Sequence, residues 1–273
     1  MISVEHISFS YNGKTPALDD VSLTVPDGEF LCILGANGSG KSTLGRHLNG
    51  LLMPQKGRVS VDDEDTAIEQ ARYNVRSKVA MVFQNPDDAL VSTLVEDDVA
   101  FGPANLGIPS EELRRRVTQS LSAVRLQGFE KHDVNALSGG QKQRVCIAAA
   151  LAMAPKVLVM DEPTAMLDPQ GRESVLRIEK ACQAQGMTIV HITHLMEEAL
   201  LADRVAIMSE GRIVELGSPA EILTDQDRLT KWGLAAPSTV QLACALCERG
   251  VSVAPCLQKD RLKEQLCCLL SNR

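Results

Sequence analysis

The sequence predicts an α/β fold in which a parallel sheet is joined to an N-terminal antiparallel sheet, an inserted helical region and a helical C-terminal extension. Two observations support this fold class. The apolar run Phe30–Leu34 leads into the glycine-rich segment 35–43 (GANGSGKST), which is typical of a buried strand that turns into a helix. The apolar run Val157–Met160 ends in Asp161 and Glu162, as a second buried strand of the same sheet would.

The N-terminal part is expected to form strands and the first helix. Residues 2–9 and 21–25 alternate apolar and polar side chains, which predicts two strands that each bury one face. The helix after the glycine-rich segment should end near Gly50. Segments 58–62 and 78–83 are expected to pair as strands and to complete the antiparallel sheet.

From residue 85 to residue 154 the pattern becomes helical, which predicts a helical subdomain of about residues 86–155. Ser110 is the expected N-cap of one helix there. The apolar residues of that helix recur at spacings of three and four, which gives it one buried face. They are Leu113, Val117, Leu121 and Val124.

The parallel sheet is expected to continue after this insertion, with a helix from about Arg172 to Gln185 between two of its strands. The predicted strands are residues 156–160, 187–193, 204–208 and 212–215. The segment Ser218-Pro219-Ala220-Glu221 has the residue types of a helix start. Amphipathic helices at 238–248 and 259–270 follow, so we expect domains 1–224 and 225–273.

The composition excludes several kinds of partner and location. The 28 Lys and Arg residues against 35 Asp and Glu give a net charge of −7, so no nucleic-acid partner is expected. The longest apolar run, Val145–Ala154, is about half of the roughly 20 residues that span a bilayer. The first residues lack the basic and apolar regions of a signal peptide, which favours the cytosol.

The cysteines are concentrated near the C-terminus. Cys244 and Cys247 have a spacing that allows a zinc site, but the later cysteine pair is adjacent and no histidine follows Cys244. We therefore favour packing as small apolar side chains over metal binding.

Segment 35–42 fits the pattern G-x-x-x-x-G-K-[ST] of a phosphate-binding loop. Its glycines let backbone N–H groups converge on phosphates, and the helix N-terminus adds a partial positive charge. Lys41 would reach the β and γ phosphates of a nucleotide, and Ser42 would offer its hydroxyl to Mg²⁺. A plain glycine-rich turn is the alternative, which the strand before the loop and the helix after it disfavour.

Asp161 and Glu162 would emerge at the carboxyl edge of the sheet, where open α/β sheets bind ligands. Asp161 can hold Mg²⁺ directly or through water, and Glu162 can act as the general base toward the attacking water. A solvated strand end is the alternative for the pair taken alone. The phosphate-binding loop earlier in the chain favours the functional interpretation.

Residues 137–141 (LSGGQ) precede a helix that begins KQRVCIAAALAMA. Ser138 could act as an ordinary N-cap of this helix. Two glycines beside the cap, however, would let a phosphate approach the same helix end, which a cap alone does not require.

These segments, together with Gln84 and His194, resemble in their order the nucleotide-binding subunits of ATP-binding cassette transporters. The resemblance rests on GANGSGKST, LSGGQKQR and VLVMDEPTAMLD. It implies a RecA-like P-loop core that takes ATP and Mg²⁺. It also implies a dimer in which the LSGGQ signature of one subunit covers the ATP held by the other.

The resemblance also implies roles for single residues. Tyr11 matches the aromatic residue that stacks on adenine, and Gln84 matches the glutamine that senses Mg²⁺ and the membrane partner. Asp168 matches the acid that couples the two facing sites, and His194 matches the switch histidine near the γ-phosphate.

Taken together, the expected catalytic residues are Glu162 and His194. The expected ATP-binding residues are Tyr11, Gly35, Asn37, Gly38, Ser39, Gly40, Lys41, Ser42, Thr43 and Gln84. The expected Mg²⁺ ligands are Ser42, Gln84 and Asp161. The expected signature residues, which would contact the partner's ATP, are Leu137, Ser138, Gly139, Gly140 and Gln141.

A closer resemblance, to the ATPases of energy-coupling factor transporters, covers most of the chain. It rests on FQNPDDALVSTLVEDDVAFGPANLGIP, MLDPQGR and GLAAPSTVQLACALCERG. This group includes cobalt, nickel and vitamin importers, so the resemblance implies ATP-driven uptake of a micronutrient. Leu195 departs from the acidic residue common after the switch histidine, and DEPTAMLD combines features of two ATPase paralogues.

The closer resemblance implies a second ATPase subunit, as a homodimer or a paralogous heterodimer. It further implies an integral membrane coupling subunit, a substrate-binding membrane subunit and a peripheral position on the cytoplasmic face of the cell membrane. Two alternatives are a soluble cassette ATPase of iron–sulfur assembly or repair and a non-hydrolysing regulatory module. The second is disfavoured because Lys41, Glu162 and His194 are all present.

The segment after Gln84 is the expected contact with the membrane subunit. Its acids would attract the basic ends of membrane-subunit helices, and its apolar residues would add contact area. The acids are Asp87, Asp88, Glu96, Asp97 and Asp98, and the apolar residues are Leu90, Val91, Leu94 and Val95. An ordinary acidic loop and helix is the alternative.

Overall fold

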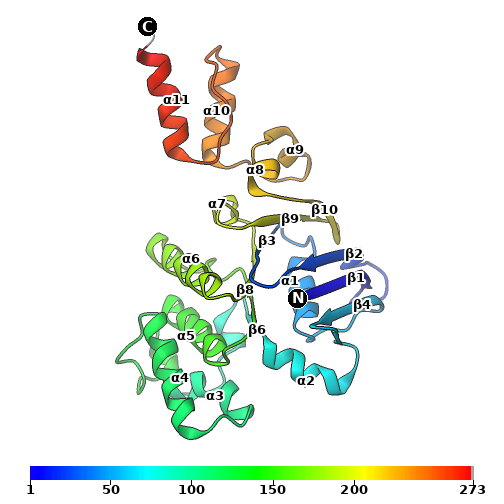
Figure 1. The fold of residues 1–273 in the computed structure, drawn as a ribbon, viewed down its shortest axis with the longest axis vertical. Coiled ribbons are helices and arrows are strands. Elements are labelled where there is room, and N and C mark those ends of the chain that lie inside the picture. The colour runs from blue at the N-terminus through cyan, green and yellow to red at the C-terminus, as the bar shows by residue number, and fades with distance from the viewer. Residues whose placement is uncertain (272–273) are drawn as a thin grey trace.

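The computed structural model describes residues 1–271 and contains two sheets with helices around them (Figure 1). The smaller sheet has four strands in the order β2-β1-β4-β5, and all of its pairs are antiparallel. Its strands are β1 (Ile2–Phe9), β2 (Leu18–Val25), β4 (Lys56–Val61) and β5 (Glu64–Asp65). The alternating pattern near the N-terminus therefore predicted the first two strands correctly.

The larger sheet has six strands in the order β10-β9-β3-β8-β7-β6 and is parallel except for the β9–β10 pair. The strands are β3 (Phe30–Leu34), β6 (Val79–Val82), β7 (Val157–Asp161), β8 (Thr188–Thr193), β9 (Arg204–Ser209) and β10 (Arg212–Gly217). Every residue of β3, β7 and β8 is buried, as expected for a parallel sheet that is covered on both faces.

One predicted strand lies in a different sheet from the one expected. Segment 78–83 was expected in the antiparallel sheet, whereas β6 pairs in parallel with β7 in the larger sheet. The helix α2 (Glu69–Lys78), which the sequence pattern did not reveal, carries the chain from one sheet to the other. The parallel β6–β7 pair needs a long crossover, because a tight turn can only join antiparallel strands, and the helical region between the two strands supplies it.

Besides α2, helices lie in four parts of the described chain. The helix α1 (Lys41–Leu48) follows β3 and ends near Gly50, as predicted. The helical region consists of α3 (Val95–Asn105), α4 (Ser110–Ala123) and α5 (Gly139–Ala152), with 3-10 turns at Pro86–Asp88 and Val134–Ala136. The helices α6 (Pro169–Ala184) and α7 (Met196–Ala199) join strands of the larger sheet. The C-terminal helices are α8 (Pro219–Leu223), α9 (Gln226–Lys231), α10 (Ser238–Glu248) and α11 (Lys259–Ser271).

Two helices begin earlier than their predicted starts. Ser110 is the first residue of α4, and Pro109 is its N-cap, because the carbonyl of Pro109 accepts the N–H of Leu113 at 2.8 Å. The helix α6 begins at Pro169 rather than near Arg172, since Asp168 caps it and proline suits the first helical position. The capped start of α8, by contrast, is confirmed by a capping box between Ser218 and Glu221.

The larger sheet separates two hydrophobic cores. Alternate residues of β3 point to opposite faces: Phe30 and Cys32 belong to the core shared with the helical region, whereas Leu31 belongs to the core shared with the smaller sheet. Figure 1 shows the helices α3–α6 on the side away from the smaller sheet. A third cluster, which includes Ala243 and Leu262, joins α10 to α11.

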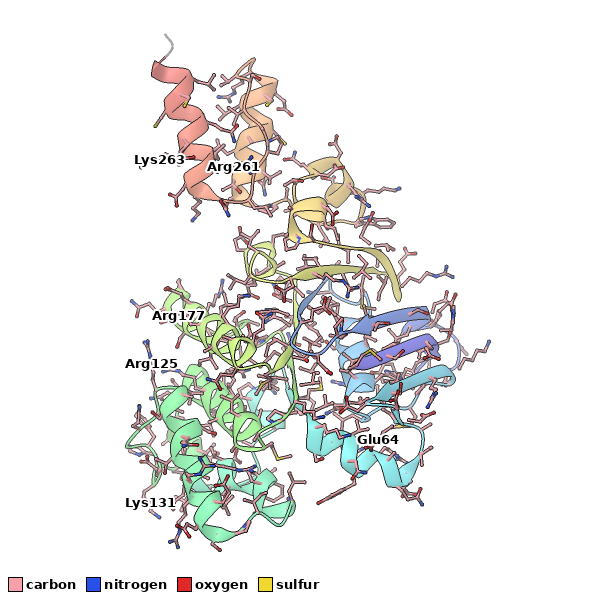
Figure 2. All side chains as sticks on the ribbon, viewed as in Figure 1. Glu64, Arg125, Lys131, Arg177, Arg261 and Lys263 are labelled. Atoms are coloured by element: carbon pink, nitrogen blue, oxygen red, sulfur yellow. The ribbon has the colours of Figure 1, made fainter. Side chains whose placement is uncertain are left out.

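The C-terminal extension begins inside the larger core. Leu234, Ala236 and Val240 are buried in the core that contains the helical region, before α10 and α11 extend away as a hairpin (Figure 1). Charged side chains cover the outer surfaces, as Figure 2 shows for Lys131 near the helical region and Arg261 on α11. None of the helices in residues 1–271 has the length and apolar composition that a bilayer span requires.

Candidate nucleotide-binding site

The loop between β3 and α1 has a backbone that only glycine can provide at two positions. Gly40 has a φ of 103°, and a Cβ atom there would lie 2.5 Å from the carbonyl oxygen of Ala17. A Cβ atom on Gly35 would lie 2.4 Å from the carbonyl oxygen of Met208. The loop is therefore packed tightly against the strand ends beside it, and its N–H groups remain at the start of α1.

Two polar side chains of the loop, those of Lys41 and Ser39, are buried at the start of α1. Lys41 is 4% exposed, and its Nζ donates to the carbonyl oxygens of Gly35 at 2.8 Å and Ala36 at 3.0 Å. Burial lowers the pKa of Lys41, while the nearby Glu162 and Asp161 oppose this shift. The buried Oγ of Ser39 has no hydrogen-bond partner in residues 1–271. A buried hydroxyl without a partner and a buried amine at the start of a helix fit a phosphate.

The ends of β7 and β8 bring the acidic residues to this loop. The Oγ of Ser42 donates to Oδ1 of Asp161 at 2.9 Å. Burial raises the pKa of Asp161, and this hydrogen bond together with nearby cations opposes the shift. Nε2 of Gln84 donates to Oε2 of Glu162 at 3.1 Å, and Nδ1 of His194 lies 3.3 Å from the same oxygen.

A cavity of about 510 Å³ lies between the phosphate loop, Gln84 and Glu162. Nine of the residues expected from the sequence contribute to its wall: Tyr11, Asn37, Gly38, Gly40, Lys41, Ser42, Thr43, Gln84 and Glu162. Tyr11 is 59% exposed, and its hydroxyl lies 3.3 Å from Oγ1 of Thr43. Ala17 also lines the cavity, although an alanine after a loop carries no signal that sequence analysis could use.

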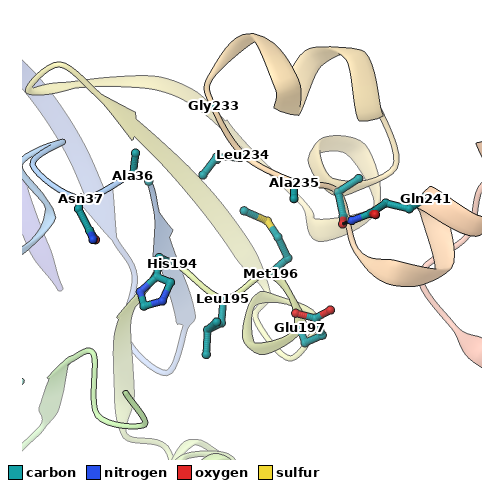
Figure 3. Close-up of a pocket in the computed structure, with 12 residues that line it drawn as sticks. Ala36, Asn37, His194, Leu195, Met196, Glu197, Gly233, Leu234, Ala235 and Gln241 are labelled. Carbon is teal, nitrogen blue, oxygen red and sulfur yellow. Dashed lines mark hydrogen bonds between the residues drawn. The ribbon is translucent and has the colours of Figure 1, made fainter. Parts of the chain in front are cut away.

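A second cavity of about 400 Å³ adjoins the loop (Figure 3). His194 and the start of α7 form one side of it, and Ala36 and Asn37 form another. The remaining side is residues 233–236, from the turn that leads into α10. This turn lies in the predicted C-terminal extension, and nothing in its sequence indicates that it lies near His194.

Several predicted residues lie outside the first cavity within the described chain. Gly35 and His194 line the second cavity, whereas Ser39 and Asp161 line neither of the two. The segment Leu137–Gln141 starts α5, where Ser138 and Gln141 form a capping box, and a Cβ on Gly139 would meet no atom within 4 Å. Asp168 caps α6 by accepting the N–H of Gly171 at 2.7 Å. The N-cap interpretation of Ser138 is thus correct, and it leaves Gly139 open for an approaching group.

The fold and the site together define an ATP-binding cassette. Residues 18–165 match the ABC transporter family. The EcfA1 protein of Symbiobacterium thermophilum, an energy-coupling factor transporter ATP-binding protein, is 50% identical over 280 residues, which cover 99% of this chain and 98% of the relative. The chain belongs to the ABC transporter family, in the group of energy-coupling factor transporter ATP-binding proteins.

Two solved structures resemble this fold closely. One is cbiO1 from Clostridium perfringens, part of the ABC transporter complex cbiONQ, with a TM-score of 0.75, 35% identity, and coverage of 91% of this chain and 96% of that chain. The other is a dimeric ATP-binding cassette in a post-hydrolysis state with ADP and Pi, with a TM-score of 0.74, 30% identity, and coverage of 80% and 99%.

Proposed function

We propose that this chain is the ATP-hydrolysing subunit of an energy-coupling factor transporter and drives uptake of a micronutrient, either a vitamin or a transition-metal ion. The observation that carries this proposal is the meeting of Lys41, Ser42, Gln84 and Glu162 in one cavity at the carboxyl edge of the larger sheet. Family membership supports the type of transporter.

The residues at the cavity suit Mg²⁺. Asp161 and Ser42 are hydrogen-bonded neighbours, and Gln84 lines the same cavity, so a carboxylate, a hydroxyl and an amide oxygen are available. Hard oxygen atoms are the ligands that Mg²⁺ prefers, together with nucleotide phosphates. We propose Ser42, Gln84 and Asp161 as its ligands. When bound, Mg²⁺ would neutralise part of the phosphate charge.

Glu162 is the proposed general base. Its carboxylate lies among polar groups, since Gln84 and His194 both contact Oε2, and it reaches the cavity that the phosphate loop borders. A carboxylate in this position can accept a proton from the water that attacks the γ-phosphate. His194 would orient groups around the same phosphate through its imidazole.

A second ATPase subunit would complete the site. Within the described chain, the signature segment Leu137–Gln141 leads into α5 and does not border the cavity that the phosphate loop lines. We propose that Gly139 and Gly140 of one subunit cover the ATP of another, with Asp168 near the junction. The partner would be a second copy or a paralogue.

The membrane subunit would dock on a groove between β6 and the helical region. This groove has a volume of about 480 Å³ and includes Val91, which is 61% exposed, and Phe101, which is 51% exposed. We propose that these apolar side chains receive a helix of the integral coupling subunit, which holds this chain at the cytoplasmic face of the membrane beside the substrate-binding subunit.

The structure changes the expected role of several residues in this segment. Asp98 is 5% exposed and accepts the N–H groups of Val91 at 2.7 Å and Ser92 at 2.9 Å, so it is not free to attract a partner. Val95 is fully buried. Glu96 forms an ion pair with Lys131. The apolar groove therefore replaces the acids as the main feature of the proposed contact.

The substitution Glu162→Gln tests the proposed chemistry. Gln keeps the size and the hydrogen bonds of the side chain but cannot accept the proton, so hydrolysis should fall by about 10²-fold or more with ATP binding intact. Phosphate release and nucleotide affinity would be measured on the same preparation. Glu173 is exposed, so Glu173→Gln is the matched control. Equal turnover in the two variants would show that Glu162 is not the general base.

Copurification separates the transporter from the alternative of a soluble cassette ATPase. Expression of a tagged chain in its native membranes should recover an integral membrane subunit with it. Recovery of the active ATPase without any membrane subunit would favour the alternative. A variant with Phe101→Glu should lose the membrane subunit while keeping basal hydrolysis.

A further inference from the structure

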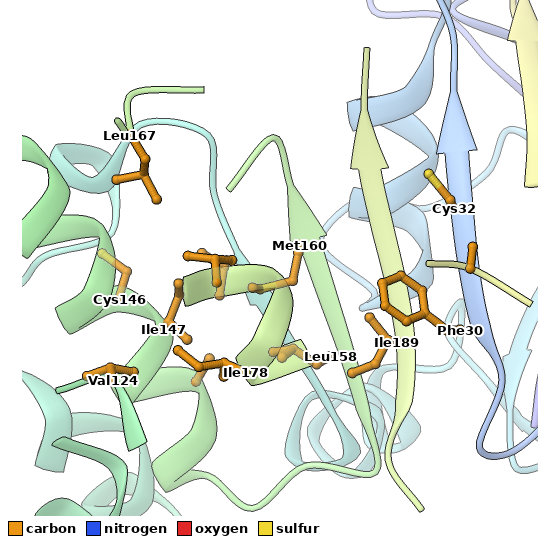
Figure 4. Close-up of a cluster of buried hydrophobic side chains, with 14 of the residues drawn as sticks. Phe30, Cys32, Val124, Cys146, Ile147, Leu158, Met160, Leu167, Ile178 and Ile189 are labelled. Atoms are coloured by element: carbon orange, nitrogen blue, oxygen red, sulfur yellow. The ribbon is translucent and has the colours of Figure 1, made fainter. Parts of the chain in front are cut away.

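A buried charged group lies behind the catalytic edge of the sheet. Nδ1 of His191 lies 2.7 Å from Oε1 of Glu179, and Nε2 lies 2.9 Å from Oε2 of Glu198. None of the three side chains is more than 4% exposed. His191 is two residues from Ile189 and shares its face of β8, beside Phe30 and Cys32 of β3 (Figure 4).

The two carboxylates require a protonated ring. A neutral imidazole has one N–H donor, but here each ring nitrogen faces a carboxylate oxygen, so both must donate. Burial alone lowers the pKa of His191, and the charges and hydrogen bonds of Glu179 and Glu198 outweigh it and raise the pKa to about 10. The ring therefore links helix α6 to helix α7 through a strong, charge-assisted pair of hydrogen bonds.

Glu198 also holds the two loops that carry the proposed catalytic residues. Its Oε2 accepts the hydroxyl of Thr193 at 2.6 Å, and its Oε1 accepts the hydroxyl of Thr164 at 2.5 Å. Thr193 precedes His194, and Thr164 lies two residues after Glu162. Both threonines are 2% exposed or less.

Backbone hydrogen bonds connect the two threonines that contact Glu198 to the proposed catalytic residues. Oγ1 of Thr193 accepts the N–H of Leu195 at 3.1 Å, so the backbone on both sides of His194 is tied to one hydroxyl. The N–H of Ala165 donates to the carbonyl of Glu162 at 3.2 Å, which joins the Thr164 turn to Glu162. Glu198 itself does not line the proposed ATP cavity in the described chain.

We propose that Glu198, held in place by His191 and Glu179, is a positioning residue that sets the distance between Glu162 and His194 during ATP hydrolysis. The proposal rests on the roles proposed above for those two residues. They follow different strands, β7 and β8, and a displacement of about 1 Å in a catalytic group can lower a rate about 10²-fold. Because Asp168 caps the same helix that carries Glu179, the group also joins the catalytic edge to α6.

Removal of one hydroxyl at a time tests this role without removing the buried charges. Thr193→Val and Thr164→Val keep the shape of the side chain and should each lower kcat about tenfold, because the loop loses its anchor. The KM for ATP and the affinity for a non-hydrolysable ATP analogue should change less than about twofold. Thr193→Ser and Thr164→Ser keep the hydroxyl and should retain most of kcat.

The strand β8 offers a matched control at its other end. Thr188 is 2% exposed, and its Oγ1 accepts the N–H of Gly28 at 2.8 Å, so Thr188→Val removes a comparable buried hydrogen bond far from the site. It should lower the melting temperature as the other valine variants do and leave kcat of the folded protein unchanged. An equal loss of kcat in this control would mean that general stability, and not positioning, causes the effect.

Glu198→Asp provides a second variant in case a valine variant does not fold. It keeps the charge next to His191 but withdraws the carboxylate by one methylene, so kcat should again fall more than ATP affinity. The positioning proposal is wrong if the folded Thr193→Val, Thr164→Val and Glu198→Asp variants all keep the wild-type kcat. The proposed function still stands in that case, provided that the wild-type protein hydrolyses ATP and Glu162→Gln abolishes this activity.

Discussion

Glu162 occupies an unusual backbone position at the proposed catalytic centre. Its φ is 47°, in the left-handed region that residues with a Cβ seldom adopt. The N–H of Glu162 donates to the carbonyl of Ile192 at 2.9 Å, which ties this conformation to β8. Strain of this kind persists where the surrounding structure determines it, and it occurs often at functional sites. Here it turns the carboxylate away from the strand direction and toward Gln84 and His194.

At the same scale, the protonation of His191 can be tested directly. The ring nitrogens should show imidazolium chemical shifts in NMR spectra well above pH 7, because the folded pKa is about 10 and the unfolded value is about 6.5. The facing titratable groups are Glu179 from α6, Glu198 from α7 and Cys32 from β3, and burial raises the pKa of the Cys32 thiol so that it stays neutral.

The sign of the stability change follows from the raised pKa. The contribution of His191 to the free energy of unfolding should be fully present below pH about 6.5 and should be lost as the pH rises through about 10. Chemical denaturation at several pH values would measure this loss. A ring that titrates near pH 6.5 in the folded protein would contradict the buried imidazolium.

Among the elements, the start of α3 depends on Asp98. Its carboxylate satisfies two backbone N–H groups of the preceding loop, at Val91 and Ser92. Asp98→Ala should therefore lower the free energy of unfolding by about 2 kcal/mol or more, since each buried donor left unpaired costs about 1–3 kcal/mol. The exposed neighbour gives the control, and Asp97→Ala should change stability by less than about 0.5 kcal/mol. Thermal denaturation of both variants would measure the difference, and equal melting temperatures would refute this role of Asp98 in holding the loop.

The elements also show how far sequence patterns reach. The strands Phe30–Leu34 and Val157–Asp161 were predictable from their short apolar runs. A run that is followed by glycines or acids is typical of a buried parallel strand whose C-terminal end lies beside a ligand site. The strand β6 was assigned to the wrong sheet, because a run of four residues reveals a strand but not its partner. Residues 233–236 reach the site only through tertiary packing, so no local pattern marks them.

The site could be predicted to a similar degree. The phosphate loop and the pair Asp161 and Glu162 follow from spacing and residue type. Tyr11, Gln84 and His194 required the family resemblance, because a single polar residue after a strand has no chemical signature. The anchoring role of Glu198 could not be inferred, since its partners Thr164 and His191 come from separate elements and meet only in the folded chain.

For the whole molecule, the separation of the phosphate loop from the signature segment predicts that activity depends on dimers. Dilution should reduce the hydrolysis rate more than proportionally, because each complete site would need parts of two subunits. Steady-state rates would be compared with molecular masses from light scattering over the same concentration range, with and without a paralogous ATPase. A rate that stays proportional to concentration down to verified monomer would contradict the composite site.

The capping box at Ser138 has a consequence for the energetics of closing such a dimer. Because Ser138 and Gln141 already satisfy each other, the turn that carries Gly139 and Gly140 is ordered before any nucleotide arrives. A loop that had to become ordered on contact would lose about 1–2 kcal/mol of conformational entropy per residue at that moment. The signature is thus preorganised, and the free energy of closure can go into contacts with the phosphate instead of into folding the loop that receives it.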